Sequence, residues 1–308
     1  MKKCKEYKLK YFPWRWGDRR DGWRLRNITP ISILESYFSP KRVDAQILVQ
    51  ETIPIDNIEA FIKEHKEEMP DLSLMHVIIA AAVRLFSQRP KLNRFVLRNK
   101  LYARNYISMS ITIRRSMTDE GEETLIKLYF LPTDTLYDVV RKVQHALDEN
   151  KHEGDQNTAD KFSKSLTYLP GFLIRFMVFT MRWLDKFNIL PRALEEISPW
   201  HSSLYLANMG SIGSESVYHP LYEIGTCSFF LTTGKKTTQY IPRRSGEVLS
   251  LRTIMLKWSL DGRICDGLYL ASTLRMIGRL YMNPEQLLTP PEQIVVDDGV
   301  GRKRIDKS

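Results

Sequence analysis

The sequence predicts a single α/β domain, built on a mixed sheet with helices packed against it. Segments with strand and helix patterns alternate along all 308 residues. A hydrophobic content of 43% is enough for a proper core, and the length permits one large domain. No internal repeat and no low-complexity tract interrupts the alternation. A disordered tail or linker is therefore excluded.

The first half of the chain contains an extended segment, two helices and a hairpin. Residues 44–55 have an extended pattern, and residues 56–68 open with an Asp cap and continue as a helix. Residues 72–88 are apolar on nearly every face, as in a helix buried between a sheet and other protein. Apolar and polar side chains alternate in the second half of residues 101–115 and again in residues 123–131. The sequence DEGEE lies between the two segments, which predicts two paired strands.

The second half adds further helices and strands. Residues 133–150 carry one apolar stripe and predict a helix, whereas the polar stretch 151–164 is expected to be a mobile surface connection. Residues 172–190 predict an apolar helix or helix pair that ends at Pro191. The remaining elements are strands at 203–209, 226–233 and 250–260 and a helix at 268–282.

The net charge of +10 lies at the ends of the chain. Residues 1–26 hold ten basic and three acidic side chains, residues 301–308 hold four and one, and the rest is neutral. A nucleic-acid protein usually carries its positive field on the folded surface, so we predict no nucleic-acid partner. Aromatic residues accompany the charge in residues 1–26, which would suit an anionic membrane surface or base stacking. Docking of this basic arm on a neighbouring subunit or on the body is the alternative.

The cysteines and the hydrophobic segments bear on the compartment. Cys4, Cys227 and Cys265 lie far apart, which indicates neither a disulfide framework nor a thiolate zinc site and fits a reducing cytosol. The start of the chain has no apolar core of a secretory signal. The apolar stretch 169–184 is too short to span a bilayer. We expect a cytoplasmic protein, with two alternatives for this stretch: packing against a subunit, or peripheral binding to the inner face of the membrane.

A motif near the C-terminus points to a family. Residues 256–271, LKWSLDGRICDGLYLA, predict a strand that runs through a loop into a helix. This segment resembles the H-x-x-x-D-G signature of dihydrolipoamide acyltransferase catalytic domains and the related chloramphenicol acetyltransferases. The Asp-Gly pair is Asp266-Gly267, Arg263 follows the histidine position, and Gly262 occupies that position. Three further segments resemble the family in the same order, so the resemblance covers about residues 27–290: 92–113, ANMGSIG at 207–213 and NPEQLL at 283–288.

The resemblance implies a fold, an assembly and a chemistry. The fold would be a chloramphenicol acetyltransferase-like mixed-sheet sandwich that forms homotrimers, with a channel at each subunit interface for coenzyme A and the acyl carrier. In the family, the motif histidine is the general base for a thiol, a hydroxyl stabilises the oxyanion, and the motif aspartate holds the loop through an ion pair. A glycine at position 262 cannot act as the base.

Other residues are candidates for these roles. If Asp266 were the base, proton transfer from a thiol would be uphill by roughly 4 to 5 pKa units, so we expect it to order the loop. His201 is the first candidate for the base, with a structural histidine as the alternative. Ser202 and Ser203 are candidate oxyanion donors, with ordinary strand hydroxyls as the alternative. By the same resemblance, Asn208 and Arg263 are candidates for substrate binding.

Three other features are assigned structural roles. Cys265 is expected to pack as a small apolar side chain, and His219 is expected to close a turn. No second ligand stands at metal spacing, so no metal site is predicted. Gly210 and Gly213 are expected to be turn residues, because no P-loop lysine and helix follow them.

The predicted organisation is an arm at 1–26, an acyltransferase-like domain at 27–290 and a tail at 291–308. We expect no lipoyl and no peripheral-subunit-binding domain, because about 26 residues leave no room for either. We expect acyl transfer from coenzyme A or another thioester to an unidentified acceptor, with the thioester as substrate and no covalently bound cofactor. The alternative is a catalytically impaired pseudoenzyme, a trimer that binds acyl-coenzyme A or acts as a scaffold, with a membrane surface as a further partner.

Overall fold

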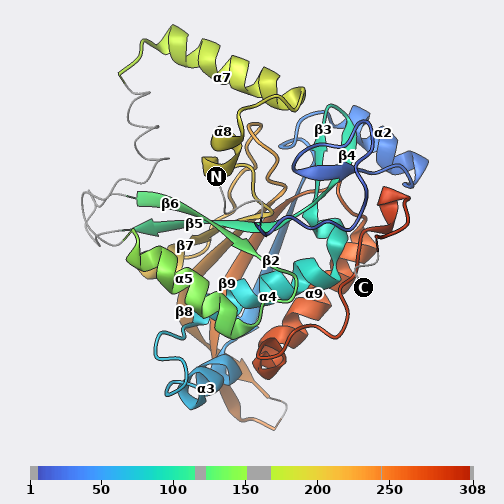
Figure 1. Cartoon of the computed structure of the whole chain (residues 1–308). Helices are drawn as coiled ribbons and strands as arrows, with labels where there is room; N and C mark the ends of the chain where they lie inside the picture. Colours follow the sequence, from blue (N-terminus) through green and yellow to red (C-terminus); the bar gives the residue numbers. More distant parts are fainter. Residues whose placement is uncertain (1–5, 115–122, 151–167, 244, 306–308) are drawn as a thin grey trace.

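The computed structural model describes residues 6–114, 123–150, 168–243 and 245–305 (Figure 1). Its core is a six-stranded sheet in the order β2-β9-β8-β7-β5-β6. The strands are β2 (Gln46–Pro54), β5 (Ile107–Arg114), β6 (Glu123–Phe130), β7 (Leu204–Asn208), β8 (Phe229–Pro242) and β9 (Val248–Asp261). β7 is parallel to both of its neighbours, β5 and β8, and the remaining pairs are antiparallel. The predicted mixed sheet and hairpin are confirmed.

Helices cover one face of this sheet (Figure 1). They are α3 (Asp56–Glu64), α4 (Leu74–Gln88), α5 (Leu136–Asp148) and α9 (Gly267–Met282). Alternation along β9 turns Leu256, Trp258 and Leu260 toward the helices, where all three are buried in the main hydrophobic core. α4 is buried along most of its length, as its apolar pattern predicts.

The starts of two helices follow directly from capping chemistry. Thr135 and Asp138 form a reciprocal capping box at α5. At α4, the backbone N–H of Ser73 donates to Nδ1 of His76 at 3.2 Å. Burial lowers the pKa of His76 to about 4, so the ring is neutral and can accept this hydrogen bond.

Two elements differ from the prediction. The segment 101–115 is divided between two sheets, because the chain turns at Asn105 and Tyr106 between β4 (Lys100–Arg104) and β5. β8 continues to Pro242, well past the predicted end at residue 233. Its second half extends beyond a register shift between Thr233 and Lys236 and is exposed, so no apolar alternation marks it. The predicted connection at 151–164 lies outside the described residues.

A smaller sheet joins residues near the N-terminus to the body. It has the order β1-β4-β3, with β1 at Gly22–Arg24 and β3 at Arg94–Leu97. Phe12 and Trp23 are buried in a second hydrophobic cluster that includes Val300 from the other end of the chain. Arg94 donates to both oxygens of Asp297, at 2.6 and 2.7 Å. The described residues near both termini therefore pack on the body.

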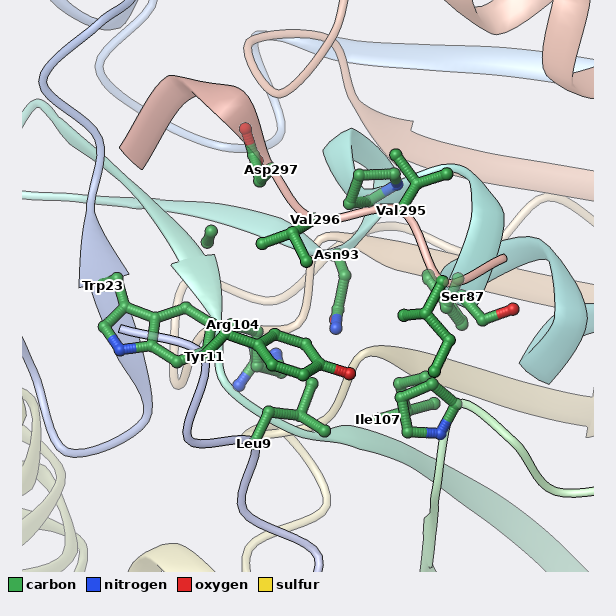
Figure 2. Close-up of a pocket in the computed structure, with 15 residues that line it drawn as sticks. Leu9, Tyr11, Trp23, Ser87, Asn93, Arg104, Ile107, Val295, Val296 and Asp297 are labelled. Atoms are coloured by element: carbon green, nitrogen blue, oxygen red, sulfur yellow. The ribbon is translucent and has the colours of Figure 1, made fainter. Parts of the chain in front are cut away.

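A small cavity lies where these ends meet the body (Figure 2). Leu9, Tyr11 and Val296 line it together with Asn93 and Arg104. Its volume is about 30 Å³, which is the scale of one water molecule. This cavity is too small to hold a coenzyme.

Replacing Trp23 by Ala is expected to lower the free energy of unfolding by about 3–5 kcal/mol, because it empties the second cluster. Trp16→Ala is the matched control, since Trp16 is 84% exposed, and should change it by no more than about 0.5 kcal/mol. Urea denaturation followed by circular dichroism measures both. Equal effects of the two substitutions would contradict the packing of the N-terminal residues.

Candidate active site

The motif loop joins the end of β9 to the start of α9, and a buried carboxylate holds it. Arg263 donates to both oxygens of Asp261, at 2.8 and 2.7 Å, and Arg42 lies 3.7 Å from the same carboxylate. Arg263 also donates to the carbonyl of Ser39 at 2.8 Å. The side chain of Asp261 is fully buried. The predicted substrate ligand Arg263 is thus engaged within the loop.

Asp266 holds the other end of the loop. Its Oδ1 accepts a hydrogen bond from the backbone N–H of Tyr269 at 2.8 Å, which caps α9. This backbone hydrogen bond is the main cause of the lowered pKa of Asp266. The ion pair that the resemblance assigns to the motif aspartate is made instead by Asp261, whereas Asp266 acts as a helix cap. Its side chain is exposed beside the loop.

Gly262 has no room for a side chain. A Cβ built on it would lie 2.8 Å from the carbonyl oxygen of Ala45 and 3.0 Å from the side chain of Ile47. The backbone N–H of Gly262 also donates to that carbonyl at 2.8 Å. β2 and the loop are therefore in direct contact at the position where the resemblance expects a histidine.

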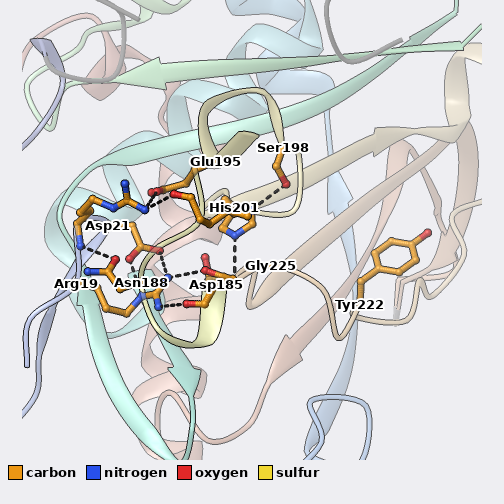
Figure 3. Close-up of polar contacts among 12 residues, drawn as sticks. Arg19, Asp21, Asp185, Asn188, Glu195, Ser198, His201, Tyr222 and Gly225 are labelled. Carbon is orange, nitrogen blue, oxygen red and sulfur yellow. Dashed lines mark hydrogen bonds and ion pairs between the residues drawn. The ribbon is translucent and has the colours of Figure 1, made fainter. Parts of the chain in front are cut away.

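His201 lies in a buried polar network (Figure 3). The ring is 2% exposed. Its Nδ1 lies 2.8 Å from Oγ of Ser198, and its Nε2 lies 3.2 Å from Oδ2 of Asp185. Arg19 donates to the other oxygen of Asp185 at 2.7 Å and to Asp21 at 2.8 Å. Both ring nitrogens of His201 therefore face polar partners within the fold.

Asp185 is the charged centre of this network. Burial alone would raise the pKa of its carboxyl, but His201 and Arg19 outweigh burial and hold it at about 2. Asp185 is the one buried residue of α7 (Gly171–Lys186). The network therefore fastens that helix to the segment that precedes β7.

The two serines are also buried. Ser202 is fully buried and donates to the carbonyl of Pro199 at 2.8 Å. Oγ of Ser203 accepts from the backbone N–H of Ser108 at 3.1 Å. Both hydroxyls thus join the start of β7 to its surroundings, and their role as oxyanion donors stays a prediction.

Asn208 lies at the opposite end of the sheet from the motif loop. Asn208 of β7 is the strand partner of Thr233 in β8, and Thr233 is the strand partner of Leu256 in β9. Leu256 precedes Asp261, at the end of β9, by five residues. At 3.3 Å per residue, the separation along the sheet is about 17 Å. Oδ1 of Asn208 accepts from Thr233 at 3.1 Å and from the backbone N–H of Ser211 at 3.2 Å. Within one chain, Asn208 and the motif loop are not brought together.

The turn after Asn208 is tightly packed. A Cβ on Gly210 would lie 2.5 Å from the carbonyl oxygen of Gly234 in β8. Gly213 caps the same short 3₁₀ turn in the left-handed conformation. Both glycines are therefore turn residues, as the sequence predicts.

His219, which the sequence predicts to close a turn, contacts the residue that follows it. Its Nδ1 lies 2.8 Å from the carbonyl oxygen of Pro220, and because a carbonyl only accepts, Nδ1 carries the proton. The neutral ring then has its lone pair on Nε2. The ring stacks on Phe230 at 4.0 Å, on the sheet face opposite the helices. The backbone carbonyl of His219 accepts from Gln46, whose strand partner is Asp261.

His219 therefore lies beside the strand end that leads into the motif loop. The sequence signal was limited to the turn expected at this histidine. The fold was needed to show the position of this turn.

Cys265 is not a nucleophile at neutral pH. Burial, with the neighbouring Asp266 charge second, raises the pKa of its thiol to about 12. The side chain packs in the main core. Within the described part of the chain, no group of three or more His, Cys, Asp or Glu side chains is placed to hold a metal ion.

Comparison with solved structures places the fold among acyltransferase catalytic domains. The dihydrolipoamide acetyltransferase of Azotobacter vinelandii aligns with a TM-score of 0.54 and 14% identity, over 90% of this chain and 94% of that chain. The cubic core of a pyruvate dehydrogenase multienzyme complex gives 0.54 and 13%, over 91% and 100%. A probable dihydrolipoamide acetyltransferase from Listeria monocytogenes gives 0.54 and 13%, over 89% and 97%.

The chain thus has the fold of dihydrolipoamide acetyltransferase, and the predicted fold class is confirmed. No protein-family model and no curated protein matches the sequence. The likeness therefore concerns the fold. What the site does must be argued from its residues.

Gly262→Ala is expected to lower the free energy of unfolding by about 1–3 kcal/mol, because the new Cβ forces the loop away from Ala45. Gly267→Ala is the matched control in the same loop, since a Cβ there meets nothing within 4 Å. Chemical denaturation compares the two variants. Equal stability of both would show that the loop and β2 are not in close contact.

Stability should also depend on pH through Asp185. Its pKa is lowered from 3.8 to about 2, so it contributes about 2 kcal/mol above pH 4, which is lost as the pH falls toward 2. Asp185→Asn should therefore destabilise the protein near neutral pH, and the difference from wild type should shrink on acidification. Unfolding midpoints in urea at several pH values test this. Asp148→Asn, at an exposed site, is the control, and a difference that does not change with pH would contradict the assignment.

Proposed function

We propose that the protein transfers an acyl group from coenzyme A, or another thioester, to an acceptor at a site formed between copies of the chain. The observation that carries the proposal is the motif loop, which Asp261 and Asp266 order at the edge of an acyltransferase-type sheet. Work on the Azotobacter enzyme concerns a serine, a histidine and an asparagine in its catalytic mechanism, the last two four positions apart. Gly262 and Asp266 have that spacing here.

Geometry favours a site that needs more than one copy. The motif loop and Asn208 lie at opposite ends of the sheet within one chain, so a second copy would bring the two ends together. Apolar side chains near the loop are available for such an interface: Leu268 is 77% exposed and Phe38 is 71% exposed. Phe38 immediately precedes Ser39, whose carbonyl Arg263 binds. We propose a homotrimer, as the family resemblance implies.

An apolar cavity next to Asn208 suits an acyl chain. It has a volume of about 220 Å³ and lies between α4, α5, β5 and β6. Ile79, Leu128 and Val143 are among its apolar walls, and Asn208 and Ser211 also line it. Because Oδ1 of Asn208 already accepts two hydrogen bonds, its amide N–H groups remain as donors for the oxygen of an acyl carbonyl.

In the proposed reaction the acceptor X–H attacks the thioester carbonyl. The base removes the proton of X–H, the new C–X bond forms, and the C–S bond breaks to leave the coenzyme A thiolate. The base then returns the proton to sulfur, which yields the acylated acceptor and free coenzyme A. His219 fits the base through the lone pair on Nε2, whereas His201 would first have to give up a buried partner.

The second candidate is a trimer that binds acyl-coenzyme A without turnover. The contact between Gly262 and Ala45 favours it, because the position of the family's base is closed as well as vacant. Removing a positioned general base typically costs about 10² to 10⁴ in rate. Binding in the absence of turnover is the property that separates this candidate from an enzyme.

The test measures thiol release from acetyl-coenzyme A and longer acyl-coenzymes A, with water and dihydrolipoamide as acceptors, and binding by calorimetry. We expect turnover by the wild type, and a loss of about 10² to 10⁴ in kcat with little change in KM for His219→Gln. His201→Gln should chiefly lower the thermal unfolding temperature. The assembly should have about three times the 36.1 kDa mass of one chain.

Each other outcome has a definite meaning. Binding without turnover by the wild type establishes the non-catalytic alternative, and the absence of both refutes the proposal. Turnover that survives His219→Gln and is lost in a folded His201→Gln variant assigns the base to His201. A monomeric mass with full turnover would overturn the site between copies.

A further inference from the structure

Helix α7 (Gly171–Lys186) presents an apolar surface to the outside of the molecule. It lies at the edge of the structure, away from the face of the main sheet that α4, α5 and α9 cover (Figure 1). Four of its aromatic side chains are between 47 and 71% exposed: Phe172, Phe176, Phe179 and Trp183. No described helix is long and apolar enough to cross a bilayer.

The exposed residues of α7 are segregated by angle. At 100° per residue, the four aromatic side chains fall within an arc of about 60°, which we call the aromatic stripe. Arg175, Arg182 and Lys186 fall within an arc of about 40°, centred roughly 70° away, which we call the basic stripe. The one acidic residue of the helix is Asp185, which is buried. The exposed surface of α7 is thus aromatic and cationic.

Buried charge fixes the orientation of the helix. Asp185 projects about 150° away from the centre of the aromatic stripe. Its backbone carbonyl and carboxylate accept hydrogen bonds from Arg19 at 2.6 and 2.7 Å, and His201 lies on its other oxygen. Turning the aromatic stripe inward would break this network, so the stripe is held toward the outside.

The surface next to the C-terminal end of α7 continues the same chemistry. Phe187 lies under the guanidinium of Arg98, at 4.6 Å from the ring centroid. The pKa of Lys100 is lowered, first by partial burial and then by the charges of Arg24 and Arg98. The pKa of Arg26 is likewise lowered, first by burial and then by the charges of Arg15 and Arg24. A cluster of like charges therefore extends from Arg98 to the N-terminal residues.

Two large aromatic side chains complete this surface. Trp14 and Trp16 are 71 and 84% exposed and flank Arg15. Arg26 donates to the carbonyl of Trp16, which places the two tryptophans beside the basic cluster. Exposed tryptophan next to arginine is the composition that membrane interfaces favour.

We propose that α7 and this adjoining surface bind the face of an anionic lipid bilayer. The aromatic stripe enters the boundary between headgroups and acyl chains, and the basic stripe reaches the lipid phosphates. Electrostatic attraction adds to the binding through the cluster that begins at Arg98. The helix lies parallel to the membrane plane.

Charge argues against a two-fold contact with a second copy of the chain through α7. A two-fold contact through α7 would place the basic stripes of two copies near each other, with no exposed acidic residue of the helix to neutralise them. A surface rich in phosphate supplies the opposite charge. The depth of four bulky apolar rings also favours a partner with a hydrocarbon interior.

The experiment is vesicle co-sedimentation of the full chain, with phosphatidylcholine alone and with phosphatidylcholine mixed with phosphatidylglycerol. We expect binding to the anionic vesicles that weakens as salt is raised. Phe176→Ser combined with Phe179→Ser should weaken binding by about tenfold or more. Tyr240→Ser is the matched control, since Tyr240 is 71% exposed on the β8–β9 hairpin.

Charge is tested by a second pair of variants. Arg175→Glu combined with Arg182→Glu should abolish the preference for anionic vesicles, whereas Arg275→Glu combined with Arg279→Glu, exposed on α9, changes net charge equally and should retain most binding. Circular dichroism confirms folding in each case. The proposal is overturned by no binding to anionic vesicles, by equal effects of test and control pairs, or by α7 variants that change only the mass of the assembly or only the retention of single-stranded DNA.

Discussion

The buried pairing of Asp261 with Arg263 is the interaction on which the candidate site depends. It closes the loop between β9 and α9 with two hydrogen bonds, and Arg42 adds a third charge from the segment before β2. Removing one partner of such a pair leaves an uncompensated charge in the interior, which typically costs about 3–5 kcal/mol. Because this pair fixes the loop from within, Asp266 is left to cap α9 and to face outward. The shape of the loop is thus maintained independently of any base on it.

The absence of a side chain at position 262 is built into the packing of the loop. A single substitution from histidine would leave a hole, whereas here the carbonyl of Ala45 occupies the space and bonds the backbone of Gly262. The proposed reaction would therefore draw its base from another element. His219 meets the requirements of tautomer and position, because Pro220 holds the proton on Nδ1 and Gln46 ties the turn to the strand beside the loop. In the proposed reaction, the oxygen-binding group would come from another copy, since Asn208 lies at the far end of the sheet.

Local pattern predicted most of the fold, because the buried strands and helices carry their periodicity in a few adjacent residues. The alternation of Leu204 and Leu206 in β7, and the apolar run of α4, are of this kind. The exposed half of β8 was missed, since pairing with β9 leaves no mark on its side chains. The motif predicted the loop. It predicted neither the contact of Arg42 with the loop nor the network around His201, in which Arg19 and Asp185 are 166 positions apart. Such long-range pairs depend on how the chain folds back, which no local pattern records.

Asp185 explains how the chain can hold an apolar helix at its surface. Hydrophobic attraction alone would rotate α7 until its aromatic rings packed against the body of the protein. The carboxylate of Asp185 prevents this rotation, because Arg19 and His201 hold it in a buried network. Withdrawing the carboxylate would leave the buried side chains of Arg19 and His201 without this partner. The orientation of α7 is therefore set by directional electrostatics, while its outward face is free to be chosen for a partner. A surface selected only for solubility would place Glu or Lys where Phe172, Phe176 and Phe179 stand, so these rings make sense as the binding side of the helix.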